Sequence, residues 1–123
     1  MRIRYSPPSQ LEIRARENEL RELARALSLG SPREFSAEQD RGPAPYQVNL
    51  RAIQVAATGG PAEIEVRGTD VSITGSQENL KRLAKFVQSA IQSDHSHFEW
   101  FAGNAFIAET SVPLVIACEP RDA

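Results

Sequence analysis

The sequence predicts one α+β domain over residues 1–123, in which tandem strand–helix–strand–strand units form one mainly antiparallel sheet with two helices packed on one face. Three observations lead to this prediction. Several short segments alternate apolar and polar residues, as half-buried strands do. Two longer segments repeat apolar residues three and four positions apart, as amphipathic helices do. The two strand–helix segments also resemble each other.

The first strand–helix pair occupies residues 11–28. Apolar and charged residues alternate over 11–16, which predicts a strand with one buried face. Leu20, Leu23 and Leu27 then fall on one side of a helix, and Gly30 follows as a residue that commonly ends one.

A long mobile loop is predicted over residues 29–46. This segment contains three prolines and two glycines, and it has no periodic apolar face. Its acidic residues Glu34, Glu38 and Asp40 are candidate partner-binding residues, because a mobile acidic segment suits a basic protein surface.

Three strands are predicted next, at 48–56, 63–67 and 71–74, joined as an antiparallel meander. The apolar residues move from even to odd positions near Ala52, which predicts a bulge there. The sheet face opposite the helices is expected to stay in contact with water. Its side chains are Glu63, Glu65, Arg67, Ser72 and Thr74.

The second helix is predicted over residues 77–92. Ser76 precedes it as a good N-terminal cap, and Leu80, Leu83 and Val87 lie on the face expected to be buried. Two final strands are expected at 104–109 and 112–118.

An internal duplication is predicted from the two strand–helix segments. At an offset of sixty residues, four identities align, namely Ile13/Ile73, Leu20/Leu80, Leu23/Leu83 and Ala24/Ala84. Pseudo-repeats are therefore expected over 9–68 and 69–120. The alternative is that any two amphipathic helices show such spacings without a common origin.

Composition argues against several classes of function. The net charge of −2 argues against nucleic acid as the main partner, because phosphate binding requires a basic surface. No apolar run reaches the roughly 20 residues that span a bilayer, so no membrane partner is expected. The lone Cys118 excludes an internal disulfide, and the first residues lack the apolar run of a signal peptide, so a cytoplasmic location is expected.

The strongest candidate for chemistry is the segment from His95 to Glu99. In an extended chain His95, His97 and Glu99 point to the same side, and imidazole and carboxylate groups bind zinc or iron. Three ligands from one short strand are crowded, however, so neither a metal nor another cofactor is predicted. No nucleophile or acid–base pair is evident in the chain, and the protein is not expected to be an enzyme.

An aromatic cluster follows the two histidines. Trp100 and Phe101 are candidate partner-binding residues, because exposed aromatic side chains often anchor interfaces. The alternative is that this cluster belongs to the core.

Four stretches of the second half resemble a known family. They are Val71-x-Ile73-x-Gly75, Leu80-x-x-Leu83-Ala84, His95-x-His97-Phe98 and Ser111-Val112-Pro113-Leu114-Val115-Ile116. Across residues 71–118 the chain resembles immunity protein family thirty-two of bacterial polymorphic toxin systems. The resemblance implies a cytoplasmic protein that neutralises a cognate protein toxin by binding it, and it brings no catalytic residue.

Two other functions remain open at this stage. One is a small metal-binding protein or enzyme that uses His95, His97 and Glu99. The other is a non-catalytic oligomerisation module, which would pair through an open sheet edge to give a homodimer.

Overall fold

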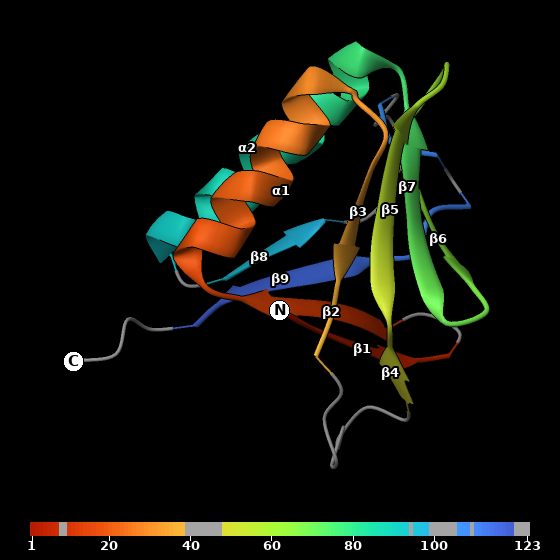
Figure 1. The fold of residues 1–123 in the computed structure, drawn as a ribbon. Coiled ribbons are helices and arrows are strands. Elements are labelled where there is room, and N and C mark those ends of the chain that lie inside the picture. The colour runs from red at the N-terminus through yellow and green to blue at the C-terminus, as the bar shows by residue number, and fades with distance from the viewer. Residues whose placement is uncertain (8–9, 39–47, 94, 99–105, 109, 120–123) are drawn as a thin grey trace.

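The computed structural model describes residues 1–7, 10–38, 48–93, 95–98, 106–108 and 110–119 (Figure 1). This part of the chain contains two helices and nine strands. The helices are α1 (Glu17–Leu29) and α2 (Gln77–Ser93). The strands are β1 (Arg2–Ser6), β2 (Gln10–Ala15), β3 (Arg33–Ser36), β4 (Val48–Leu50), β5 (Ala52–Ala57), β6 (Glu63–Arg67), β7 (Asp70–Gly75), β8 (His95–Phe98) and β9 (Leu114–Cys118).

The predicted α+β class is confirmed, but the prediction of a single sheet is wrong. The described strands form two sheets, a five-stranded one in the order β4-β1-β2-β9-β8 and a four-stranded one in the order β3-β5-β7-β6. Pairing is mainly antiparallel, with β2–β9 and β5–β7 as the parallel exceptions. Figure 1 shows the two helices side by side on one side of the molecule, with the sheets at an angle beneath and beside them.

The change of sheet takes place at Arg51, the one residue between β4 and β5. Leu50 is buried in the five-stranded sheet, whereas Ile53 and Val55 are buried in the four-stranded sheet. The parity shift near Ala52 is therefore a corner between two sheets, and the predicted bulge within one strand is wrong.

The predicted antiparallel meander is also wrong, because β7 lies between β5 and β6. The segment after β5 crosses the end of β7, where the Thr58 amide donates to the Gly75 carbonyl at 2.8 Å. This central place gives Ile73 an apolar neighbour on each side, Val55 on β5 and Ile64 on β6. Burial on both sides favours this order over sequential pairing.

Part of the predicted loop over 29–46 is a strand. β3 pairs antiparallel with β5, and Phe35 lies opposite Ile53 and packs against the core. One apolar residue among polar neighbours gives no periodic pattern, so the sequence did not indicate this strand. Residues 39–46 lie outside the described part of the chain.

Both helices bury the faces that their sequences predict. Leu20, Leu23, Leu80 and Leu83 are each 1 % exposed or less. The N-terminal cap of α2 is confirmed, because the Asn79 amide donates to Ser76 Oγ at 3.2 Å. The side chain of Gln77 also donates to the carbonyls of Ser28 and Leu29, both at 3.4 Å, so the start of α2 lies beside the end of α1.

The strand pairings of the two halves correspond to each other. In one sheet the β1–β2 hairpin is followed by β9 and β8, and in the other the β6–β7 hairpin is followed by β5 and β3. Ile3 pairs with Ile13 as Ile64 pairs with Ile73. Common origin of the halves stays a prediction, and the predicted boundary between residues 68 and 69 falls in the turn of the β6–β7 hairpin.

Gly75 lies where the chain crosses the end of β7. Its φ is +150°, and a Cβ there would stand 2.8 Å from the Cα of Ala62. We expect Gly75→Ala to lower the free energy of unfolding by about 2–4 kcal/mol, through backbone strain and the clash together. Urea denaturation measures this. Gly59→Ala is the matched control, because nothing lies within 4 Å of its Cβ position. Equal stability of the two variants would contradict the prediction.

Candidate partner-binding surface

The four-stranded sheet has an outer face that points away from the core. Along β7, Val71 and Ile73 are buried, and Ser72 and Thr74 between them are half-buried on the opposite face. We call this the outer face and define it by Glu34, Gln54, Ala56, Glu63, Glu65, Asp70, Ser72 and Thr74. It includes four of the five polar residues predicted to face water, and Arg67, the fifth, is exposed at the end of β6.

One register row crosses all four strands of this face. Glu34, Gln54, Ser72 and Glu65 are neighbours in succession on β3, β5, β7 and β6. Three strand spacings, or about 14 Å, separate the backbones of β3 and β6 in this row. A shallow hollow of about 400 Å³ lies at the β3 and β5 end of the row. It is lined by Pro32, Arg33, Glu34, Gln54, Val55, Ala56 and Ser72.

The carboxylate of Asp70 is held at the first residue of β7. Arg51 Nε and Nη2 donate to it at 3.3 to 3.4 Å, and Gln54 Nε2 donates at 2.8 Å. The hydrogen bond from Arg51 is the largest cause that lowers the pKa of Asp70, and Gln54 contributes further. Asp70 is therefore ionised at neutral pH, with most of its charge matched by Arg51.

Two glutamates interact on β6. A hydrogen bond with Glu65 is the main cause that raises the pKa of Glu63, while the same bond and Arg67 lower the pKa of Glu65. Arg67 Nε donates to Glu65 at 2.7 Å. Glu63 therefore takes up a proton first as the pH falls.

Glu34 differs from the other carboxylates of the outer face. It is exposed on β3, and among the described residues no ion pair to its carboxylate is found. Its neighbour Arg33 turns to the other side of the strand, where its guanidinium lies 4.5 Å from the Phe35 ring centre and 3.0 Å from Glu22. Glu34 is thus an exposed negative charge without a close described ion pair, and it lies near enough to Arg51 to help raise the pKa of that guanidinium.

The predicted acidic candidates do not lie together. Glu34 lines the hollow, whereas Glu38 lines a separate polar pocket with Glu19 and Glu119, and its amide donates to the Met1 carbonyl at 2.8 Å. Asp40 and the aromatic candidates Trp100 and Phe101 lie outside the described residues. Sequence reasoning missed Gln54 and Ala56 as lining residues, because only the pairing of β5 with β7 brings them beside Ser72.

The metal-site candidates are described only in part. β8 places His95 and His97 opposite Ala117 and Val115, and Glu99 lies outside the described residues. Within the ranges that the structure describes, no group of three or more His, Cys, Asp or Glu side chains could hold a metal ion. The metal-binding alternative stays a prediction.

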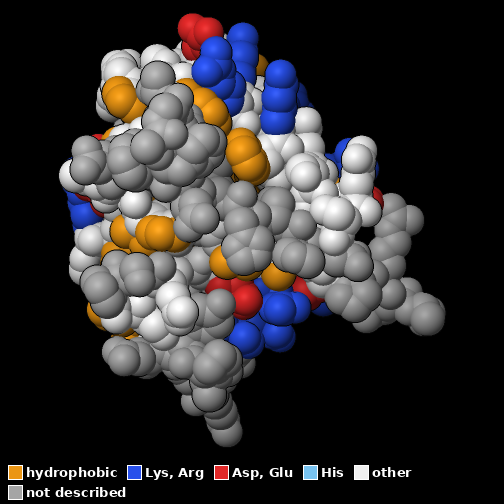
Figure 2. All heavy atoms as spheres, turned by 180° about the vertical axis from the view of Figure 1, so that it is seen from behind, with side chains coloured by type: hydrophobic (Ala, Val, Ile, Leu, Met, Phe, Trp, Pro, Cys, Tyr) orange, Lys and Arg blue, Asp and Glu red, His pale blue; other side chains and the backbone are white. Residues whose placement is uncertain are grey.

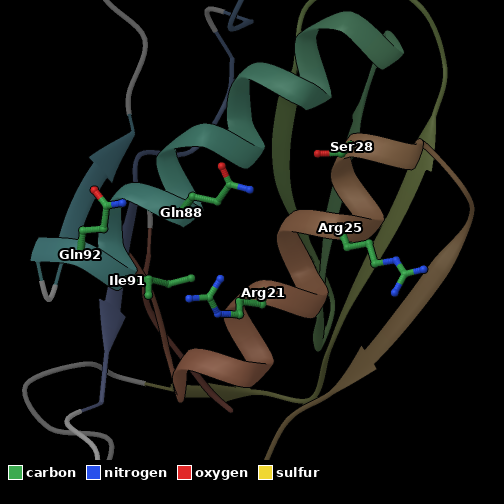
Figure 3. A pocket seen from close by; sticks show the side chains of 6 residues that line it. All are labelled: Arg21, Arg25, Ser28, Gln88, Ile91 and Gln92. Atoms are coloured by element: carbon green, nitrogen blue, oxygen red, sulfur yellow. The ribbon is translucent and has the colours of Figure 1, made fainter.

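A second hollow lies between the helices (Figure 3). It measures about 470 Å³ and is lined by Arg21, Arg25, Ser28, Gln88, Ile91 and Gln92. Arg21 extends toward α2, whereas Arg25 points away from it (Figure 3). Arg21 also lies 3.6 Å from Glu17. The two cations do not converge, so this groove is a weaker candidate site than the outer face.

The exposed side of α2 is basic, in contrast to the carboxylates of the outer face. Lys81, Arg82 and Lys85 are exposed there, and Figure 2 shows Lys and Arg side chains gathered at the upper end of the molecule. Glu34 belongs to the four-stranded sheet, whereas these basic residues belong to the helix layer. A charged partner would therefore meet a carboxylate on the sheet and basic side chains on α2.

Comparison with known families bears on the second half of the chain. Residues 70–119 match the family described as Immunity protein 32. The resemblance found in the sequence over residues 71–118 is confirmed by this match. The Imm32-matched segment contains β7, α2, β8 and β9, and thus one central strand of each sheet. The curated proteins and the solved structures gave no match.

Neither α1 nor α2, the helices of the described residues, is long and apolar enough to cross a membrane.

The glutamate pair on β6 gives a test of the electrostatics of the outer face. Because the folded state raises the pKa of Glu63, stability increases as the pH falls through that pKa and is reduced above it. We expect Glu63→Gln to leave stability unchanged or to raise it at pH 7, with the difference vanishing near pH 4. Urea denaturation at both pH values measures this, with Glu78→Gln on α2 as the control. A less stable Glu63→Gln variant at pH 7 would contradict the assignment.

Proposed function

We propose that this protein neutralises a bacterial toxin by binding it directly through the outer face. The name of the family matched by residues 70–119 supports the immunity role. One observation supports the location: a polar sheet face with a hollow lined by Glu34, to which no described helix or strand is paired or packed. Antiparallel and mixed sheets with one polar face present such a surface to partners without disturbing the core.

The carboxylates of the outer face indicate which kind of partner surface it can bind. Glu34 is exposed without a described ion pair, while Arg51 and Arg67 hold Asp70 and Glu65 in fixed positions. A toxin surface with lysine or arginine side chains can pair with Glu34 and compete for the other two carboxylates. Complementary charges of this kind mainly accelerate association and exclude wrong partners.

The proposed action is stoichiometric and needs no chemistry from this chain. The protein would act as a binding module that occupies the toxin, which agrees with the family name of the matched segment. We place this activity in the cytoplasm, where such a protein would meet a toxin that enters or is made in the cell.

A binding experiment tests the outer face. The probe is a candidate toxin domain chosen from the genes next to the one that encodes this chain, purified as an inactive variant. We expect Glu34→Lys combined with Ser72→Arg to raise the Kd at least about tenfold, through charge reversal and filling of the hollow. Calorimetry measures Kd, and survival of cells that express the active toxin measures protection.

The matched control is Glu78→Lys on α2, where the glutamate side chain is 80 % exposed. It makes the same charge reversal as Glu34→Lys outside the outer face and should leave Kd and protection unchanged. If the outer-face variant still binds and the α2 variant does not, the interface lies on the helices and not on the outer face. Absence of any complex would contradict the proposed function.

A further inference from the structure

We infer that the toxin supplies an extended segment with basic side chains, which pairs with the free edge of β3 and adds a fifth strand to the four-stranded sheet. This inference rests on the proposed function and specifies how the partner engages. Strand addition of this kind combines backbone hydrogen bonds for affinity with side-chain contacts for specificity.

The opposite edge of the same sheet is already closed. On β6, the Ile64 amide donates to Ser111 Oγ at 2.9 Å, and the Val112 amide donates to the Ile64 carbonyl at 2.8 Å. Ala62 and Ile107 also form an isolated bridge beside it. In the five-stranded sheet, β4 covers the corresponding edge of β1.

β3 has no such cover in the described part of the chain. Its one described strand partner is β5, and the side chains of Arg33, Glu34 and Ser36 are all exposed. An exposed edge strand presents unpaired backbone donors and acceptors to an incoming chain. The edge of β3 is thus where a further strand can pair with this sheet.

The backbone pattern identifies which groups are available. The Ala37 amide donates to the Arg51 carbonyl at 2.7 Å, toward β5, and the next amide, of Glu38, donates to Met1 in another direction. Because alternate residues of a strand point their amides to opposite sides, Phe35 bonds toward β5. Glu34 and Ser36 therefore present their N–H and C=O groups to the open side.

Side-chain chemistry specifies the incoming segment. A strand added beside β3 extends the row that contains Glu34, Gln54 and Ser72, and its side chain in that row lies about 5 Å from Glu34. A lysine or arginine there forms an ion pair with Glu34, whereas an acidic residue is repelled. Arg33 does not obstruct this approach, because it is held at Glu22 and Phe35.

Residue-resolved hydrogen exchange tests the inference on the full chain with the same inactive toxin domain. In the free protein, the amides of Glu34 and Ser36 should exchange fast and the amide of Phe35 slowly. Complex formation should slow exchange at Glu34 and Ser36 by at least about tenfold, as newly formed strand hydrogen bonds do. Exchange at Phe35 should change less.

Ser36→Pro provides a second measurement, because it removes the outward N–H and leaves the bonds to β5 in place. It should weaken binding at least about tenfold, whereas Ser36→Ala, which changes only the side chain, should not. Unchanged chemical shifts in the core verify that both variants fold. If Ser36→Pro does not fold, exchange at Glu34 and Ser36 in the unmodified protein decides the question.

The possible outcomes separate the two proposals. A complex that leaves Glu34 and Ser36 unprotected overturns strand addition and keeps the proposed function. No complex overturns both. If these amides become protected without toxin as the concentration of this chain rises, a second copy of the chain binds the edge. That result also overturns the inference.

Discussion

The parallel pairings β2–β9 and β5–β7 hold the two halves of the chain together. Each joins a strand of the first half to a strand of the second, so neither half completes a sheet by itself. Leu11 lies opposite Leu114, and Ile53 lies opposite Val71. The apolar surface of both halves is therefore buried in one common core, which also includes the helix pair. Contacts so distant in sequence are expected to make folding slow relative to a helical bundle of this size.

This interlocking arrangement also builds the candidate surface. The first half contributes Glu34 and Gln54, and β6 and β7 contribute Glu65 and Ser72 to the same row. The helices cover the inner faces of the sheets, and the outer face points away from the core. Carboxylates and small polar side chains can therefore stay in contact with water there. Charged groups there remain hydrated, which keeps the cost of holding several carboxylates near one another low.

The family match and the candidate surface overlap only in part. The Imm32-matched segment supplies β7 and β9, the strands that join the two halves, while β3 and β5 precede it in the chain. The matched segment is thus mainly a scaffold for the shared core, and the free edge with Glu34 comes from the part outside it. The proposed binding edge therefore lies outside the scaffold, where exposed substitutions alter stability by small amounts.

Local sequence patterns were enough to predict the two helices, the cap at Ser76, the positions of β2, β6, β7 and β9, and the polar character of the outer face. Each depends on periodicity or chemistry among residues close in the chain, as at Leu20, Leu23 and Leu27. Contacts between distant segments set the remaining features: the two sheets, the corner at Arg51, the strands β3 and β8, and the free edge beside Glu34. A strand shows the same alternation whichever neighbour it pairs with, so partners are chosen by burial between distant segments, which no local pattern contains.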